Sequence, residues 1–244
     1  MRIRVLGFRG NLIMEGTRVP GHVEIAYSRL RSPEFVHVNV LSNLVMRKTC
    51  LQTDRMWNMT VLPNLPVELS VEGFVIIEDC SFSSPYAEEV FYRLARTSWE
   101  RSGDFERADK YYYLEMVARR NIRRTARVRG FKRLLINVEI GFEWLFADLT
   151  CKYGTDWKRP IVIWLFTVNV LFPLLFSATH SIVGVSSPGG ILDYEYFSIV
   201  TATTLGYGDY HPVGVGRAIA SLEALFGMFM WAVFLTVFAR KYMR

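Results

Sequence analysis

The sequence has little cysteine and little histidine, and this scarcity excludes several kinds of site. The three cysteines, Cys50, Cys80 and Cys151, are odd in number and far apart, so they fit neither a disulfide framework nor a zinc-binding pattern. The four histidines are scattered, and no catalytic combination of a nucleophile, a base and an orienting group can be assembled from them. We therefore expect no enzyme activity and no cofactor.

Several familiar motifs are missing as well. The amino terminus, MRIRVLGFRG, is basic but lacks the long apolar core and the cleavage site of a signal peptide. The chain has no G-x-G-x-x-G nucleotide-binding motif and no recognisable nucleic-acid-binding motif. With 244 residues and a net charge of +6, we expect one or two domains.

The carboxy-terminal third, in contrast, contains two long apolar runs. Residues 160–178 carry no charge, and residues 218–239 carry a single ionisable side chain, Glu223. A helix needs roughly 20 apolar residues to cross a bilayer, so both runs are long enough. A buried helix of a soluble core is the alternative, but such helices rarely lack a polar face over this length.

Basic residues give the expected orientation. Lys152, Lys158 and Arg159 precede the first apolar run, and Arg240 and Lys241 follow the second, whereas residues 179–216 contain no Lys or Arg. The positive-inside rule therefore places both termini in the cytoplasm and the connection outside, in a multi-pass protein of the cell membrane.

The connection between the two runs contains the most specific motif of the sequence. A helix is expected from the segment ILDYEYFSIVTATT, which is followed by Thr204-Leu205-Gly206-Tyr207-Gly208-Asp209. Irregular backbone is tolerated inside a bilayer only where it lines a water-filled path. The hexapeptide resembles the potassium-channel filter T-V-G-Y-G-D at five of its six positions. The resemblance covers residues 160–244, the two-span pore unit.

The resemblance implies a role for each filter residue. The backbone carbonyls of Thr204, Leu205, Gly206 and Tyr207 would replace the water around a transported K⁺ ion, with Gly208 completing the ion-binding loop and Asp209 at the outer mouth. Successive carbonyls can face one way only if left-handed dihedrals alternate with ordinary ones, which glycine adopts without a steric cost. One filter supplies a quarter of each oxygen ring, so the resemblance implies a homotetramer.

Other positions of the pore unit differ from the usual potassium-channel pattern or are candidates for a functional role. Val200 replaces a glutamate found in some bacterial members, and Tyr196 could donate to Asp209; both would support the filter. Gly227 matches the gating-hinge glycine of the family, although a small residue here also permits close helix packing. Glu223 is an intramembrane carboxylate that lies either behind the pore helix or on a water-filled cavity.

The rest of the chain is expected to form an amino-terminal cytoplasmic α+β domain before the α-helical, tetrameric channel fold. We expect a β-rich domain over residues 1–85, a helical hairpin and basic helix over 86–130, an interfacial amphipathic helix and linker over 131–159, and the pore over 160–244. The hairpin resembles one tetratricopeptide unit, except that Arg96 stands where a small residue is expected.

Two patterns in the first 150 residues allow alternatives. A five-residue spacing runs from Val36 through Met46, Leu51 and Met56 to Val61, as in pentapeptide-repeat β-helices, but an ordinary small sheet is the preferred expectation. The run from Arg119 to Arg133 has eight basic residues and no acid. Because an apolar stripe follows it, we expect it to meet anionic lipid headgroups rather than nucleic acid. The stripe consists of Phe131, Leu134, Leu135, Val138, Phe142, Leu145, Phe146 and Leu149.

Taken together, the sequence predicts a potassium-selective channel subunit whose second membrane helix bends near Gly227, coupled to the amino-terminal domain and its unknown cytoplasmic ligand. A weakly selective cation channel is an alternative within the same class. A membrane-anchored interaction module with a non-conducting pore is an alternative of a different class. The filter sequence favours conduction.

Overall fold

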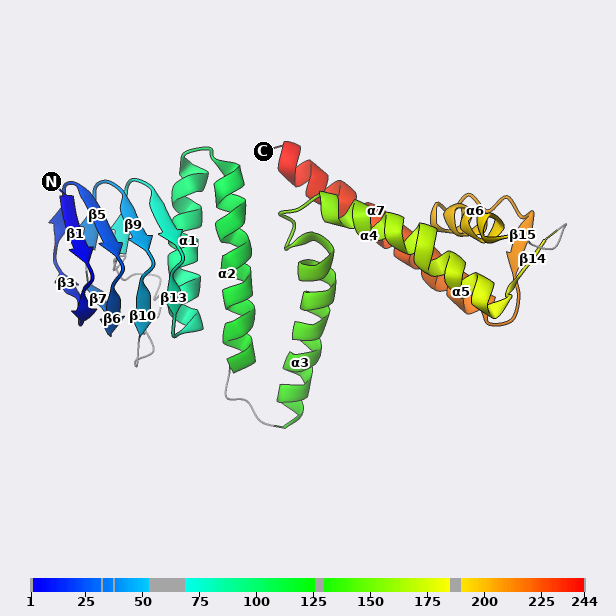
Figure 1. Cartoon of the computed structure of the whole chain (residues 1–244), viewed down its shortest axis with the longest axis horizontal. Helices are drawn as coiled ribbons and strands as arrows, with labels where there is room; N and C mark the ends of the chain where they lie inside the picture. Colours follow the sequence, from blue (N-terminus) through cyan, green and yellow to red (C-terminus); the bar gives the residue numbers. More distant parts are fainter. Residues whose placement is uncertain are drawn as a thin grey trace. The chain divides into compact units, whose positions relative to one another are not determined.

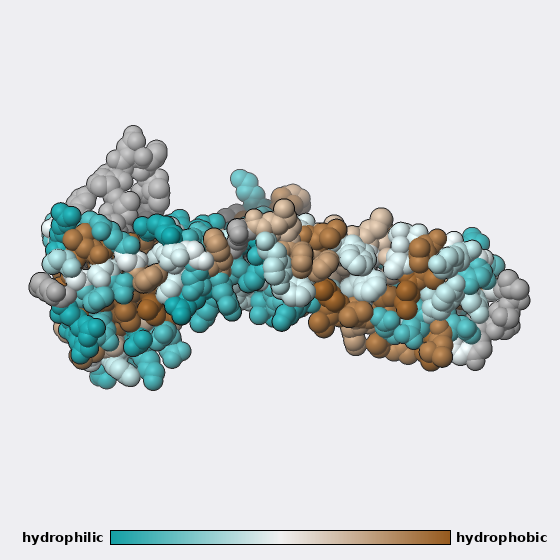
Figure 2. Space-filling view, turned by 90° about the horizontal axis from the view of Figure 1, so that it is seen from above, coloured by the Kyte–Doolittle hydropathy of each residue, from teal (hydrophilic) through white to brown (hydrophobic). Residues whose placement is uncertain are grey.

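The computed structural model describes residues 2–31, 33–36, 38–52, 69–125, 130–184 and 190–243 (Figure 1). The chain divides into two compact units, Met1–Ile140 and Gly141–Arg244. Hydrophilic residues cover much of the visible face of the first unit, while hydrophobic residues are more frequent on the second (Figure 2).

Short parallel strands form the first part of unit one. They are β1 (Arg2–Leu6), β2 (Arg9–Gly10), β3 (Ile13–Glu15), β4 (Arg18–Val19), β5 (His22–Ala26), β6 (Arg29–Arg31), β7 (Glu34–Val36), β8 (Val38–Val40), β9 (Leu44–Arg47), β10 (Cys50–Gln52), β11 (Leu69–Val71), β12 (Val75–Glu78) and β13 (Ser81–Phe82). They stack in the orders β1-β5-β9-β12, β2-β6-β10-β13, β3-β7 and β4-β8-β11. The chain therefore winds as a four-sided solenoid (Figure 1).

The register of the strands corrects the preferred expectation of an ordinary small sheet, which is wrong. Arg2 lies opposite His22 and Val23 opposite Leu44, so one coil takes 20 or 21 residues, or about four five-residue steps. Met46 and Leu51 of the five-residue spacing are fully buried inside the coils. Met56 and Val61 lie outside the described residues. Membership of the pentapeptide-repeat family stays a prediction.

Local polar contacts hold one corner of the solenoid in the same shape in successive coils. Tyr27 and Lys48 occupy this corner with φ values of 53° and 45°, in the left-handed region. The next residue in each coil, Ser28 and Thr49, turns its hydroxyl back to the carbonyl two residues earlier, at 2.9 Å in both cases. These bonds satisfy buried polar groups while the aliphatic side chains of the strands fill the interior.

Two antiparallel helices cover the end of the solenoid. They are α1 (Pro85–Arg101) and α2 (Phe105–Thr125), joined by a turn in which Gly103 has a φ of 78°. The indole of Trp99 donates to the Val75 carbonyl at 3.0 Å, and the Ser98 hydroxyl accepts from the Val75 amide at 3.1 Å. The helices thus supply hydrogen bonds that a further coil would otherwise give to β12.

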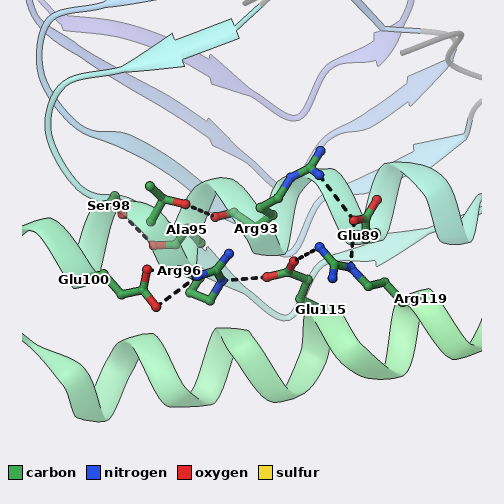
Figure 3. Close-up of polar contacts among 9 residues, drawn as sticks. Glu89, Arg93, Ala95, Arg96, Ser98, Glu100, Glu115 and Arg119 are labelled. Carbon is green, nitrogen blue, oxygen red and sulfur yellow. Dashed lines mark hydrogen bonds and ion pairs between the residues drawn. The ribbon is translucent and has the colours of Figure 1, made fainter. Parts of the chain in front are cut away.

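A buried ion-pair network joins the two helices and explains the unexpected Arg96. Figure 3 shows the carboxylate of Glu115 between two guanidinium groups. The Arg96 side chain donates to it at 2.7 Å and the Arg119 side chain at 2.6 Å, while Glu115 itself is fully buried. A small residue in place of Arg96 would leave part of this charge without a partner. The tetratricopeptide assignment itself stays a prediction.

The predicted interfacial segment is helical. Helix α3 (Phe131–Glu143) continues directly into the π-helical turn η1 (Trp144–Leu149). All eight members of the apolar stripe are exposed, from 40% for Phe146 to 72% for Phe131. Phe146 packs edge-on against Phe229 of the carboxy-terminal helix, with ring centroids 5.2 Å apart, and the stripe as a whole stays largely exposed.

The remaining elements of unit two belong to the carboxy-terminal region. They are α4 (Lys158–Phe166), the π-helical segment η2 (Thr167–Leu171), α5 (Phe172–Thr179), β14 (Ile182–Gly184), α6 (Ile191–Ala202), β15 (Tyr210–Pro212) and α7 (Gly216–Tyr242). The continuous helix Lys158–Thr179 and helix α7 are both long and apolar enough to cross a membrane, judged by length and composition.

Candidate functional site

Helix α6 packs against both long helices, and a loop follows it. Phe197 of α6 packs edge-on against Phe176 of α5, with ring centroids 5.1 Å apart. Strands β14 and β15 then pair antiparallel, with Val183 opposite His211. The two ends of the connection are therefore fastened to each other, and residues 203–209 form the loop between α6 and β15.

The loop backbone alternates between left-handed and ordinary conformations. Thr204, Gly206 and Gly208 have φ values of 59°, 58° and 84°, while neither Leu205 nor Tyr207 has a positive φ. An alternation of this kind is what the sequence predicts for a loop whose successive carbonyl groups face one way, and glycine adopts the left-handed conformation without a steric cost. The left-handed Thr204 was not expected, because a side chain costs roughly 1–2 kcal/mol in this conformation.

The last turn of α6 fixes where the loop begins. The amide of Thr204 donates to the carbonyl of Thr201, and the amide of Leu205 donates to the carbonyl of Val200, both at 3.0 Å. Val200 itself is buried, with 7% of its surface exposed. Val200 therefore supports the start of the loop through its backbone.

The side chains of the loop find few partners within one chain. Leu205 is 58% exposed and Tyr207 is 68% exposed. Both side chains are therefore largely uncovered within a single chain.

The outer end of the loop joins α6 through Asp209. Its carboxylate interacts with the Tyr196 hydroxyl, and this interaction raises the pKa of Tyr196. The ring of Tyr196 also lies edge-on to that of Tyr210, with centroids 6.2 Å apart. Tyr196 and Asp209 are thus brought together in the way the sequence suggested.

The second long helix contacts the back of α6 at two predicted positions. Glu223 is fully buried and contacts the hydroxyl of Ser198, so it lies behind α6 rather than on a water-filled cavity. At Gly227, a Cβ atom would meet the carbonyl oxygen of Ala202 and lie 3.0 Å from its carbonyl carbon. This geometry supports close packing at Gly227; its role as a hinge stays a prediction.

A contact between the start of the first long helix and the end of the second was not predicted from the sequence. The Arg240 guanidinium donates to the carbonyl of Tyr153 at 3.0 Å. Trp157 packs edge-on against Phe238 and Tyr242, with centroids 5.9 and 6.1 Å apart. The clustered aromatic residues before residue 158 and after residue 237 were the available signal.

Comparison with known proteins supports an ion-channel pore in this region. Residues 161–244 match the family described as "Ion channel". Over 91 residues the chain is 33% identical to the inward rectifier potassium channel Kirbac3.1 of Paramagnetospirillum magnetotacticum, covering 35% of this chain and 31% of that protein. Over 44 residues it is 52% identical to the protein LctB of Geobacillus stearothermophilus, covering 18% of this chain and 33% of that protein.

These matches limit what can be carried over. The chain spans about a third of the length of the curated relatives it matches. Together with the two apolar helices, the matches support a channel pore in a membrane, and they point to transport rather than enzyme catalysis.

Proposed function

We propose that the chain is a subunit of a potassium-selective channel that conducts K⁺ passively. The alternating backbone at Thr204, Gly206 and Gly208 carries this proposal. It is the conformation that a column of carbonyl oxygens requires, and it occurs between two helices suited to a bilayer. Residues Thr204 to Tyr207 would supply the carbonyls, Gly208 would complete the turn, and Asp209 would raise the cation concentration at the mouth.

The exposed filter side chains support assembly as a homotetramer. A single loop cannot surround an ion, because its carbonyl oxygens would reach the ion from one side only. Four copies around a common axis would complete each oxygen ring and would bring neighbouring subunits against the exposed Leu205 and Tyr207. The Tyr207 ring would then brace the filter against a neighbouring subunit.

The membrane setting follows from the same elements. Both termini would lie in the cytoplasm, as the basic residues flanking the two helices favour. The exposed stripe of α3 and η1 would lie in the membrane interface. Arg119 is held by Glu89 and Glu115, so headgroup contacts would fall to later members of the basic run. Arg127 and Arg129, two of these, lie outside the described residues.

Reconstitution into liposomes tests the proposal through separate fluxes of K⁺ and Na⁺. We expect K⁺ flux to exceed Na⁺ flux in the parent and to be lost in Gly206→Ala, whose new Cβ would disfavour the left-handed backbone at that residue. Gly214→Ala is the matched control: Gly214 also has a left-handed φ, 53°, and also has open space around its Cα, but it lies outside the filter.

Each other outcome contradicts a defined part of the proposal. Equal K⁺ and Na⁺ fluxes would indicate a weakly selective cation channel. The absence of both fluxes would favour an interaction module with a non-conducting pore. A Gly206→Ala variant that conducts like Gly214→Ala would overturn the filter assignment.

A further inference from the structure

The hydroxyl group of Ser198 connects three segments of the pore unit. Ser198 lies on α6 and is fully buried. Its Oγ is 2.6 Å from the carbonyl oxygen of Val168 in η2, and it also contacts Oε1 of Glu223 in α7. One small side chain therefore links the helix before the filter to both long helices.

The carbonyl of Val168 needs this partner because of the π-helical segment and Pro173. Within η2 the helix is wound more loosely, and the amide of Phe172 donates to the carbonyl of Thr167, five residues earlier. In the same pattern the carbonyl of Val168 would accept from the amide of residue 173, but proline has no amide hydrogen. A buried carbonyl without a donor is costly, and the Ser198 hydroxyl supplies the missing bond.

The position of the hydroxyl hydrogen then decides the state of Glu223. A hydroxyl has one hydrogen to donate, and a carbonyl can only accept, so the hydrogen of Ser198 is directed to Val168. The contact between Ser198 and Glu223 therefore needs a hydrogen from Glu223. A carboxylate has none, whereas a carboxylic acid has one.

The surroundings of Glu223 agree with an uncharged side chain. Its second oxygen, Oε2, is buried and has no hydrogen-bond partner. Among the described residues, no Lys, Arg or His forms a salt bridge with it. An ionised carboxylate in this position would lose its hydration with neither a counter-charge nor a full set of donors.

We propose that Glu223 is a neutral carboxylic acid and a positioning residue of the pore. The acid O–H of Glu223 donates a hydrogen bond to Oγ of Ser198, whose own hydroxyl donates a hydrogen bond to the carbonyl of Val168. This relay ties α6 to η2 and α7 and so fixes the helix from which the filter loop starts. The protonation stands on the local geometry alone, and only the effect on conduction rests on the proposed function.

Infrared spectroscopy of the purified protein in lipid tests the protonation directly. At neutral pH we expect a carbonyl-stretch band of a protonated carboxylic acid that is absent from Glu223→Gln. Glu106→Gln, an acid-to-amide change on the exposed start of α2, should retain the band. In Ser198→Ala the band should move, because the acid has lost its acceptor. A parent spectrum without the band, or a band unmoved in Ser198→Ala, would overturn the proposal.

A comparison of variants separates this proposal from the function of the pore. The amide of Glu223→Gln can still donate to Ser198, so this variant should keep the parent's melting temperature and K⁺ flux. Glu223→Ala should have a lower melting temperature and no K⁺ flux. Equal losses in the two variants would mean that the carboxyl group acts as an anion. A parent with the band but without flux would contradict the proposed function and leave the protonation standing.

Discussion

Gly227→Ala separates close packing from hinge bending at the second long helix. The added Cβ would approach backbone atoms of Ala202, 3.0 Å from its carbonyl carbon and 3.1 Å from its Cα, and backbone cannot rotate away as a flexible side chain can. Overpacking of this kind costs about 1–3 kcal/mol. The better helix propensity of alanine returns about 1 kcal/mol, so we expect a net loss of up to about 2 kcal/mol.

Thermal unfolding of the detergent-solubilised protein measures this loss. At about 2–4 °C per kcal/mol for a chain of this size, the melting temperature should fall by up to roughly 8 °C. Gly141→Ala is the control, since Gly141 lies in helix α3 with no atom within 4 Å of a new Cβ, and its melting temperature should rise or stay the same. If Gly227→Ala behaves like this control and changes only the open probability, the packing argument fails and the hinge is supported.

Three further predictions concern other parts of the chain. Glu115→Ala should lower the free energy of unfolding in urea by about 1.5–3 kcal/mol, because it removes the fully buried carboxylate that accepts from Arg96 and Arg119, while Glu100 and Glu89 still pair with these two guanidinium groups. Glu24→Ala at a more exposed pair should cost at most about 1 kcal/mol, and equal losses would refute the buried network. Leu205→Val keeps the backbone carbonyl and should keep the K⁺-to-Na⁺ flux ratio, and a collapse of that ratio would mean that the leucine side chain sets selectivity. Burial raises the pKa of the Cys80 thiol, so with Cys50 and Cys151 replaced by serine its alkylation at neutral pH should be slower than in urea and should accelerate as the pH rises; identical rates in both would contradict this.

The pore unit was predictable because its signals are local. Length and apolarity define the two long helices, and the glycines at 206 and 208 indicate a left-handed backbone conformation that other residues rarely adopt. Thr204 shows the limit of this reasoning, because a β-branched residue gives no sign that it adopts a left-handed conformation. Local hydrogen bonds that close the end of α6, from the amides of Thr204 and Leu205, stabilise this conformation.

The amino-terminal unit was less predictable because its defining contacts are distant in the sequence. Alternating apolar residues occur in any half-buried strand, so they do not reveal that Val23 pairs with Leu44 in parallel. The same limit applies to Arg96, whose partner Glu115 lies on the next helix. Pro173 was visible in the sequence, but nothing near it indicated that Ser198 would replace its missing amide.

The solenoid also sets how the amino-terminal unit can vary in height. Each coil adds one strand spacing, about 4.8 Å, to the stack. Leu44 pairs with Val75, so this step of the stack contains more residues than the others and yet keeps the parallel register. Insertions at corners therefore widen the unit and leave its height unchanged, while duplication or loss of a whole coil changes the height in fixed increments. The distance between the two ends of the solenoid could therefore change only in discrete steps.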